Sequence, residues 1–143
     1  FAGFPGVRVF IDRTLEDARA TGVVKTLFGR RRPVPDVTSH NGQVRQAAER
    51  VAVNMPIQGT AADILKRAMI DVHHALEQRP AGPDGRRARM ILTVHDELLF
   101  EVARDEADTL AAQVKTLMEG AAELAVPLTV DVGIGENWNE AKQ

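Results

Sequence analysis

Two short apolar runs separated by a few polar residues form the clearest pattern in the chain. Residues 90–93 are apolar and β-prone, and residues 98–102 form a second run of the same kind. An antiparallel pair of strands needs only a short turn, whereas a parallel pair needs a crossover of about a dozen residues or more. The pattern therefore predicts a β-hairpin with Val94, His95, Asp96 and Glu97 at its tip.

Hydrophobic positions that recur every three or four residues predict three helical regions elsewhere in the chain. These regions are 4–22, 43–76 and 104–120. Pro56 is expected to break or kink the second region, because proline has no N–H group and its ring crowds the preceding turn.

Further short strands are expected at 23–28 and at 128–132, the latter because apolar and polar side chains alternate there. Pro33 and Pro35 are expected to exclude regular structure directly after three consecutive arginines, Arg30, Arg31 and Arg32. The whole pattern predicts an α+β fold, with helices packed on a small antiparallel sheet that contains a β-hairpin.

The composition is that of an ordinary globular protein. A chain of 143 residues with 44% hydrophobic and 27% charged residues is sufficient for one domain with a core. The absence of cysteine excludes disulfides and thiolate metal sites, and it favours a reducing, cytoplasmic location. No apolar run is long enough to cross a bilayer, so no membrane partner is expected.

The charge is distributed unevenly along the chain, although the net charge is only −2. Residues 1–60 contain nine Lys/Arg and five Asp/Glu, whereas residues 103–143 contain three and eight. A basic first part and an acidic last part suit a protein that presents one face to phosphates.

The acidic pair Asp96 and Glu97 is the first candidate for chemistry. Carboxylates between apolar strands cost stability unless a cation lies against them, and a divalent metal ion is one such cation. The alternative is a polar turn exposed to water.

Two polar groups precede the hairpin in sequence. Arg30, Arg31 and Arg32 form either a solvated turn or a grip on a phosphate backbone. Asn54 and Gln58 flank Pro56, where their amides can bind bases or sugars, or else cap backbone groups freed at the proline.

Five stretches of the sequence occur in a distinctive order: Thr26–Arg32, Ala48–Arg50, Asn54–Asp63, Val94–Glu97 and Val132–Trp138. Together they resemble the carboxy-terminal part of bacterial family A DNA polymerases, the DNA polymerase I type. The resemblance covers nearly the whole chain, and the combination of the third and fourth stretches is its most specific part.

This resemblance implies a palm subdomain with an adjoining fingers segment, over residues 1–143. Asp96 would be one of two aspartates that hold the catalytic Mg²⁺ ions, with Glu97 as an auxiliary acid. His95, Gln58 and Asn54 would contact the primer terminus and the minor groove, and Arg30, Arg31 and Arg32 would lie close to DNA.

The implied activity is template-directed nucleotidyl transfer by a two-metal mechanism in DNA replication or repair. The implied partners are a primer–template duplex, deoxynucleoside triphosphates and the remaining polymerase chain upstream, which would carry the second aspartate and the triphosphate-binding helix. The 143-residue chain by itself is expected not to polymerise.

Two other functions are considered beside this one. In the first, the chain would be an inactive module that binds duplex DNA. In the second, it would be a metal-dependent hydrolase built on His95 and Asp96. The second requires further ligands, and His73 and His74 are the only histidines nearby in sequence; they are expected to be surface residues.

Overall fold

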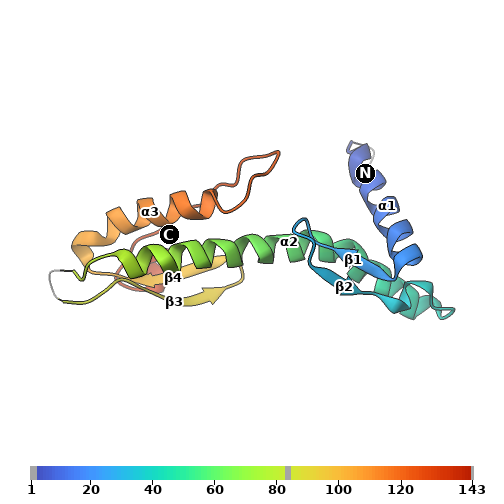
Figure 1. Cartoon of the computed structure of the whole chain (residues 1–143), viewed down its shortest axis with the longest axis horizontal. Coiled ribbons are helices and arrows are strands. Elements are labelled where there is room, and N and C mark those ends of the chain that lie inside the picture. Colours follow the sequence, from blue (N-terminus) through green and yellow to red (C-terminus); the bar gives the residue numbers. More distant parts are fainter. Residues whose placement is uncertain (1–2, 83–84, 143) are drawn as a thin grey trace. The chain divides into compact units, whose positions relative to one another are not determined.

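The computed structural model describes residues 3–82 and 85–142. The chain divides into two compact units, Phe1–Asp63 and Ile64–Gln143, and each is described by itself. Helix α2 (Gly42–Gln78) contributes its first part to unit 1 and its last part to unit 2. Figure 1 labels the helices and strands.

Unit 1 consists of helices around a small two-stranded sheet. Helix α1 (Pro5–Thr21) begins with proline and ends at Gly22, whose φ of +69° suits a left-handed helix cap. Strands β1 (Val23–Lys25) and β2 (Arg31–Pro33) pair in antiparallel register, and the short 3₁₀ helix η1 (Pro35–Thr38) follows. The core joins these elements to α2 and consists of Ala18, Val24, Val34, Val37, Ala52 and Met55.

Helix α2 runs through Pro56 without a break. Of the two outcomes predicted for this position, a break or a kink, the break is therefore wrong. The two residues that hold this part of the helix in the core, Ala52 and Met55, lie directly before the proline and are buried. After it, the hydroxyl of Thr60 donates a hydrogen bond to the carbonyl of Pro56. Packing of Ala52 and Met55 therefore offsets the local cost of an interior proline.

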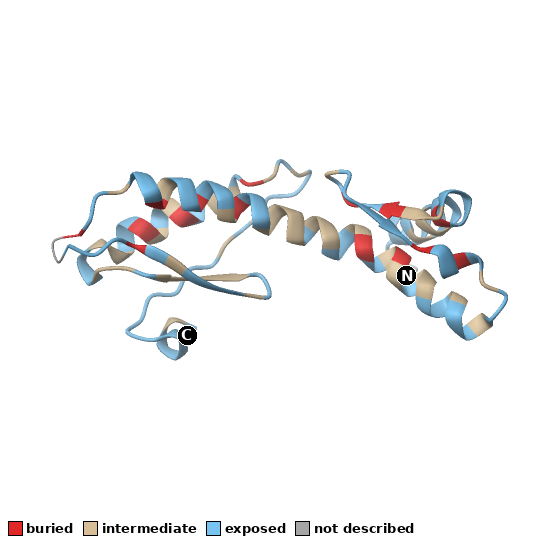
Figure 2. Ribbon diagram, turned by 60° about the horizontal axis from the view of Figure 1, so that its bottom comes forward, coloured by how far each residue is buried: buried red, intermediate tan, exposed pale blue. Residues whose placement is uncertain are grey.

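Unit 2 contains the predicted hairpin. Strand β3 (Arg89–Val94) pairs with β4 (Glu97–Glu101) in antiparallel register, and η2 (Arg104–Glu106) leads into α3 (Ala107–Glu119). A four-residue helix, α4 (Trp138–Ala141), follows near the end of the chain. The buried core of the unit consists of Val72, Leu76, Ala88, Leu110 and Val114, and Figure 2 shows such positions in red on α2 and α3.

The α+β fold class is confirmed, with two antiparallel hairpins as separate sheets. The strand predicted at 128–132 is wrong, because no strand forms there. Side chains of α3 bind its backbone instead: Val130 N–H donates to Glu119 Oε1 at 3.0 Å, and Val130 O accepts from Lys115 Nζ at 2.6 Å. Regular structure also does not stop before Pro33, which is the last residue of β2.

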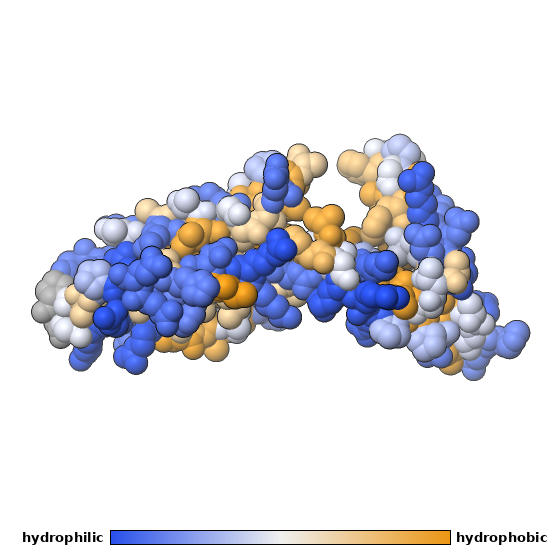
Figure 3. Space-filling model, viewed as in Figure 1, coloured by the Kyte–Doolittle hydropathy of each residue, from blue (hydrophilic) through white to orange (hydrophobic). Residues whose placement is uncertain are grey.

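Several large apolar side chains lie at the surface. In unit 1 they include Phe4, Val9 and Leu27, which are 72%, 48% and 66% exposed. Hydrophobic atoms are visible at the surface over α1 in Figure 3. Among the residues that the structure describes, no helix combines the length and apolar character needed to cross a bilayer.

Candidate functional site

His95 and Asp96 form the two-residue loop of the β3–β4 hairpin. The register pairs Val94 with Glu97, which leaves only these two residues between the strands. At the other end of the hairpin, Met90 and Phe100 pack against the core of unit 2. The partly buried base therefore anchors a loop that presents its side chains to solvent.

The backbone of His95 has φ of +54°, which no other described non-glycine residue matches in sign. Residues other than glycine adopt this region in only a few per cent of cases, because the Cβ atom crowds the following carbonyl, although asparagine, aspartate and histidine do so more often than the rest. Two-residue hairpin loops require positive φ at their first central residue. The loop thus accepts local strain at His95, which glycine would relieve because it has no Cβ atom, and such strain is concentrated at functional sites.

Asp96 is exposed at the loop, with its carboxylate accessible from solvent. Within residues 3–82 and 85–142, no three His, Cys, Asp or Glu side chains lie close enough together to hold a metal ion. The hairpin tip therefore offers one carboxylate with an acidic neighbour, Glu97. Such a donor set suits Mg²⁺, which is commonly bound by one or two carboxylates together with water and substrate phosphates.

Asn54 and Gln58 lie one helical turn apart on α2, and both are exposed. Residues four apart on a helix lie on the same face, so the two amides form a short polar row. In the described part of the chain neither amide makes a side-chain hydrogen bond, so neither acts as a cap for the backbone at Pro56. The hydroxyl of Thr60 donates to the carbonyl of Pro56 itself, not to the carbonyl of Ala52, which is the one that loses its helical donor when position 56 is proline.

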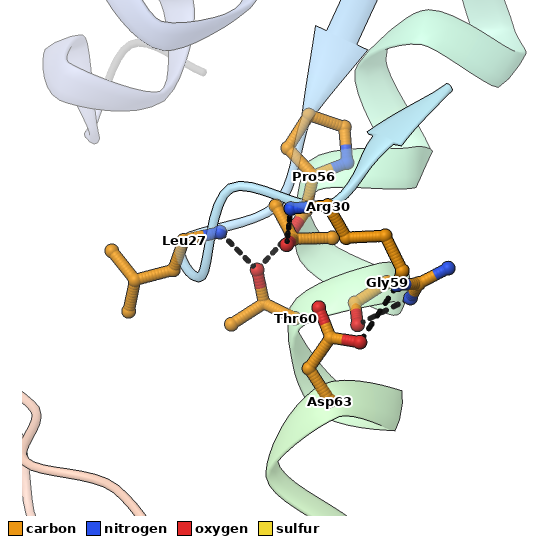
Figure 4. Close-up of polar contacts among 7 residues, drawn as sticks. Leu27, Arg30, Pro56, Gly59, Thr60 and Asp63 are labelled. Carbon is orange, nitrogen blue, oxygen red and sulfur yellow. Dashed lines mark hydrogen bonds and ion pairs between the residues drawn. The ribbon is translucent and has the colours of Figure 1, made fainter.

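Arg30 is held against α2 by its own side chain. Its Nε donates to Asp63 Oδ1 at 2.7 Å, and its Nη2 donates to the carbonyl of Gly59 at 2.9 Å. A side chain of α2 holds the same turn, because Thr60 Oγ1 accepts a hydrogen bond from Leu27 N–H at 2.9 Å. Figure 4 shows these contacts between the β1–β2 turn and one face of α2.

Gly59 is required by this close approach. A Cβ atom on it would lie 2.7 Å from Thr26 Cγ2 and 3.2 Å from Arg30 Nη2. The first distance is shorter than real contacts of this kind, so any side chain at position 59 pushes the turn away from the helix.

Arg31 and Arg32 behave differently from Arg30. Both lie in β2 and are exposed. In the part of the chain that the structure describes, neither guanidinium forms an ion pair or a side-chain hydrogen bond. The arginine run is therefore divided into one residue that binds its own fold and two that are available to a ligand.

The predicted residues thus fall into two groups. Asn54, Gln58 and the three arginines belong to unit 1, and His95, Asp96 and Glu97 lie together at the hairpin tip of unit 2. His73 lies 3.5 Å from Glu77 within one turn of α2, as expected of surface residues.

Sequence reasoning missed two ion pairs that involve candidate site residues. It assigned no role to Asp63, which binds Arg30. It also assigned no role to Lys142, whose Nζ lies 3.2 Å from Glu97 Oε1. A glycine inside a helical pattern is a signal of close backbone approach, so Gly59 pointed to the first pair. No local pattern pointed to the second.

The comparisons with known proteins agree on the family to which this chain is similar. The profile of DNA polymerase family A matches residues 1–140. The chain is 51% identical over 143 residues to the thermostable DNA polymerase I of Thermus aquaticus, and 50% identical over 141 residues to DNA polymerase I of Pseudomonas aeruginosa. These matches include 100% and 99% of the chain but only 16% and 15% of the relatives, so the chain spans about a sixth of their length.

The fold is similar to that of a solved polymerase structure. The POL domain of Pol1 from M. smegmatis, in complex with DNA primer-template and dNTP, matches with a TM-score of 0.89 and 47% sequence identity. The match covers 98% of this chain and 24% of that one.

Proposed function

Because the chain belongs to DNA polymerase family A, we propose that the protein that carries it is a DNA-directed DNA polymerase acting in DNA replication or repair. Residues 1–143 would form the carboxy-terminal part of its polymerase domain, the palm with an adjoining fingers segment. The observation that carries the proposal is the exposed Asp96 in the two-residue loop of a hairpin whose base packs against the core of unit 2.

Asp96 would be a ligand of the catalytic metal. Family A DNA polymerases are metal-dependent, and a carboxylate at neutral pH binds a hard divalent cation without first losing a proton. The ion would be Mg²⁺, which would stabilise charge on the attacking 3′ oxygen and on the leaving pyrophosphate. Glu97 would be an auxiliary acid next to Asp96 in the chain and not an essential ligand of the ion. The short loop and the anchored strands support this role, because they fix the carboxylate in space.

His95, Gln58 and Asn54 would bind the primer terminus and the duplex minor groove. Hydrogen-bond acceptors occur at similar places in the minor groove of every Watson–Crick pair. Donors such as amides and imidazole therefore test the shape of a base pair without reading its identity, as template copying requires. The exposed amide row on α2 supports this assignment.

Arg31 and Arg32 would bind phosphates of the primer–template duplex. An exposed guanidinium with no protein partner is free to form bidentate contacts with phosphate oxygens. Arg30 would contribute indirectly, because its ion pair with Asp63 holds the turn from which β2 begins.

The remaining polymerase chain would be an obligatory partner. It would supply the second metal-binding aspartate and the residues that bind deoxynucleoside triphosphates, so residues 1–143 alone would not polymerise. The large apolar side chains exposed in unit 1, such as Phe4 and Leu27, are available for packing against further protein.

A second candidate function is a catalytically inactive module that binds duplex DNA. The unpaired Arg31 and Arg32 favour it, because they bind phosphates whether or not a metal site is complete. Salt-dependent, sequence-independent duplex binding without any incorporation by the whole protein would support this alternative.

The test compares Asp96→Asn with wild type in the full-length polymerase. We expect nucleotide incorporation to fall at least about a hundredfold, since even outer partners of metal ligands contribute about ten- to a hundredfold. Duplex affinity, measured by fluorescence anisotropy, should change little. Asp71→Asn is the matched control, because Asp71 is an exposed aspartate on α2 in the same unit. Full activity of Asp96→Asn would refute the metal-ligand role.

A further inference from the structure

The last part of the chain forms a tightly folded turn around α4. Asn137 begins the helix, and its Oδ1 accepts from Glu140 N–H at 3.1 Å. Glu140 returns the contact, because its Oε1 accepts from Asn137 Nδ2 at 2.8 Å and its Oε2 accepts from Glu136 N–H at 3.1 Å. This arrangement is similar to a capping box, except that Glu140 binds the N–H of Glu136 and the side-chain amide of Asn137 instead of the backbone N–H of the cap residue, and it fixes the direction in which α4 leaves the preceding segment.

Two glycines before the turn are required by the same fold. A Cβ atom on Gly135 would lie 2.7 Å from Ala141 N and from Glu140 Cβ, and one on Gly133 would overlap the carbonyl oxygen of Ala141. Neither glycine has positive φ, so the reason is space rather than backbone conformation. Helix α4 therefore lies directly on the backbone of residues 133–135.

This packing directs Lys142 to the hairpin tip. Its Nζ lies 3.2 Å from Glu97 Oε1 and 4.9 Å from the centre of the Trp138 ring. The ring face attracts the ammonium group and limits the positions that it samples. Glu97 is the residue directly after Asp96, so the chain places a cation beside the acid that adjoins the proposed metal ligand.

We propose that Lys142 is a positioning residue for the hairpin tip. Its ammonium group holds the Glu97 carboxylate and neutralises its charge, so that Asp96 alone faces the divalent ion. Without Lys142, Glu97 is free to turn toward the ion and adds an uncompensated negative charge beside it. This inference rests on the proposed role of Asp96, but the Lys142–Glu97 contact itself is independent of that role.

The first measurement needs no metal and no turnover. Amide hydrogen exchange is recorded for residues 95–98 in the metal-free, full-length polymerase. The side chains of the pair are 52% and 43% exposed, so the effect is that of a surface pair. We expect Lys142→Met to raise exchange at the tip by about two- to fivefold. Lys142→Arg should keep the wild-type rates, because it retains the charge.

The second measurement is the affinity for Mn²⁺, read by electron paramagnetic resonance on a complex with a primer that ends in a dideoxynucleotide. Lys142→Met should bind Mn²⁺ about two- to fivefold more tightly than wild type, because a negative charge is released beside the ion. The same substitution should have no further effect in a Glu97→Gln background, since the lysine acts through that carboxylate. Lys115→Met is the matched control: Lys115 pairs with Glu119 at 3.5 Å, within the same unit.

The outcomes separate this inference from the proposed function. If Asp96→Asn abolishes Mn²⁺ binding while Lys142→Met binds with wild-type affinity, the positioning role is wrong. If Asp96→Asn binds Mn²⁺ as wild type does, the metal-ligand role of Asp96 is wrong, and hydrogen exchange alone decides the contact. Equal exchange at residues 95–98 in Lys142→Met and wild type would then overturn the inference, and faster exchange would support the contact.

Discussion

Arg30 and Asp63 form an ion pair at 2.7 Å across 33 residues of sequence. The Arg30 side chain is 46% exposed and that of Asp63 is 13% exposed, so the carboxylate is the more deeply placed partner. The same guanidinium also donates to the carbonyl of Gly59. The pair ties the turn between β1 and β2 to α2, and it separates the function of Arg30 from that of its two neighbours.

Removing either partner should therefore act on stability. We expect Arg30→Ala to lower the free energy of unfolding by about 1 kcal/mol, the value of a charged hydrogen bond discounted for partial exposure. Arg30→Lys should recover only part of the loss, because an ammonium group cannot contact Asp63 and Gly59 with the fixed geometry of a guanidinium. Thermal unfolding of the full-length protein measures both effects. A double substitution with Asp63→Asn that gives the sum of the single effects would show that the two residues are not coupled.

Substitutions of Arg31 and Arg32 should weaken DNA binding and leave stability unchanged, in contrast to those of Arg30. Replacing either with alanine should leave the unfolding temperature unchanged and weaken duplex binding equally for all sequences. The slope of log affinity against log salt concentration should fall in magnitude by about one for each arginine removed. Fluorescence anisotropy over a series of salt concentrations gives this slope. Arg8→Ala is the control, since Arg8 is an exposed arginine paired with Asp12 on α1; an equal loss for Arg8→Ala would mean that the effect is one of net charge alone.

Gly59→Ala should disturb the contact between the β1–β2 turn and α2, because the added methyl group needs space that the contact does not leave. The added methyl group would meet Thr26 Cγ2 at 2.7 Å, and the turn must move to accept it. Forcing extra atoms into a packed contact costs about 1–3 kcal/mol, which outweighs the gain of about 1 kcal/mol from replacing glycine in a helix. Gly6→Ala in α1 is the matched control, because no atom lies within 4 Å of its added Cβ. Calorimetric unfolding should show a lower midpoint for position 59 and an equal or higher one for position 6; the reverse order would contradict the close approach.

The sequence predicted what local periodicity determines and missed what distant contacts determine. The β3–β4 hairpin and α3 were correct within a few residues, because their apolar spacing is a local property. The continuity of α2 through Pro56 was not, since it depends on the packing of Ala52 and Met55 in the core of unit 1. The same holds for residues 128–132, whose alternating pattern suits a strand but whose backbone is bound by side chains of α3.

In the candidate site, too, local sequence was informative and distant contacts were not predicted. The residue types at the hairpin tip were recognisable, and the register places His95 and Asp96 in the loop itself. Sequence alone gave all three arginines one interpretation, because nothing in the run distinguishes the first from the others. Their separation arises from Asp63, one helical turn after Gly59 on the side of α2 that meets the turn.

The backbone of His95 provides the last prediction, because its φ of +54° places a bulky side chain in a left-handed conformation. His95→Asn should keep the hairpin intact, since asparagine tolerates this region, whereas His95→Val should lower the free energy of unfolding by about 1–3 kcal/mol. Both variants lose the imidazole, so both should weaken primer extension if that ring contacts the primer terminus. Comparing thermal unfolding with single-nucleotide incorporation separates the two roles: equal stability of the two variants would show that the loop is not strained, and full activity of His95→Asn would show that the imidazole makes no needed contact.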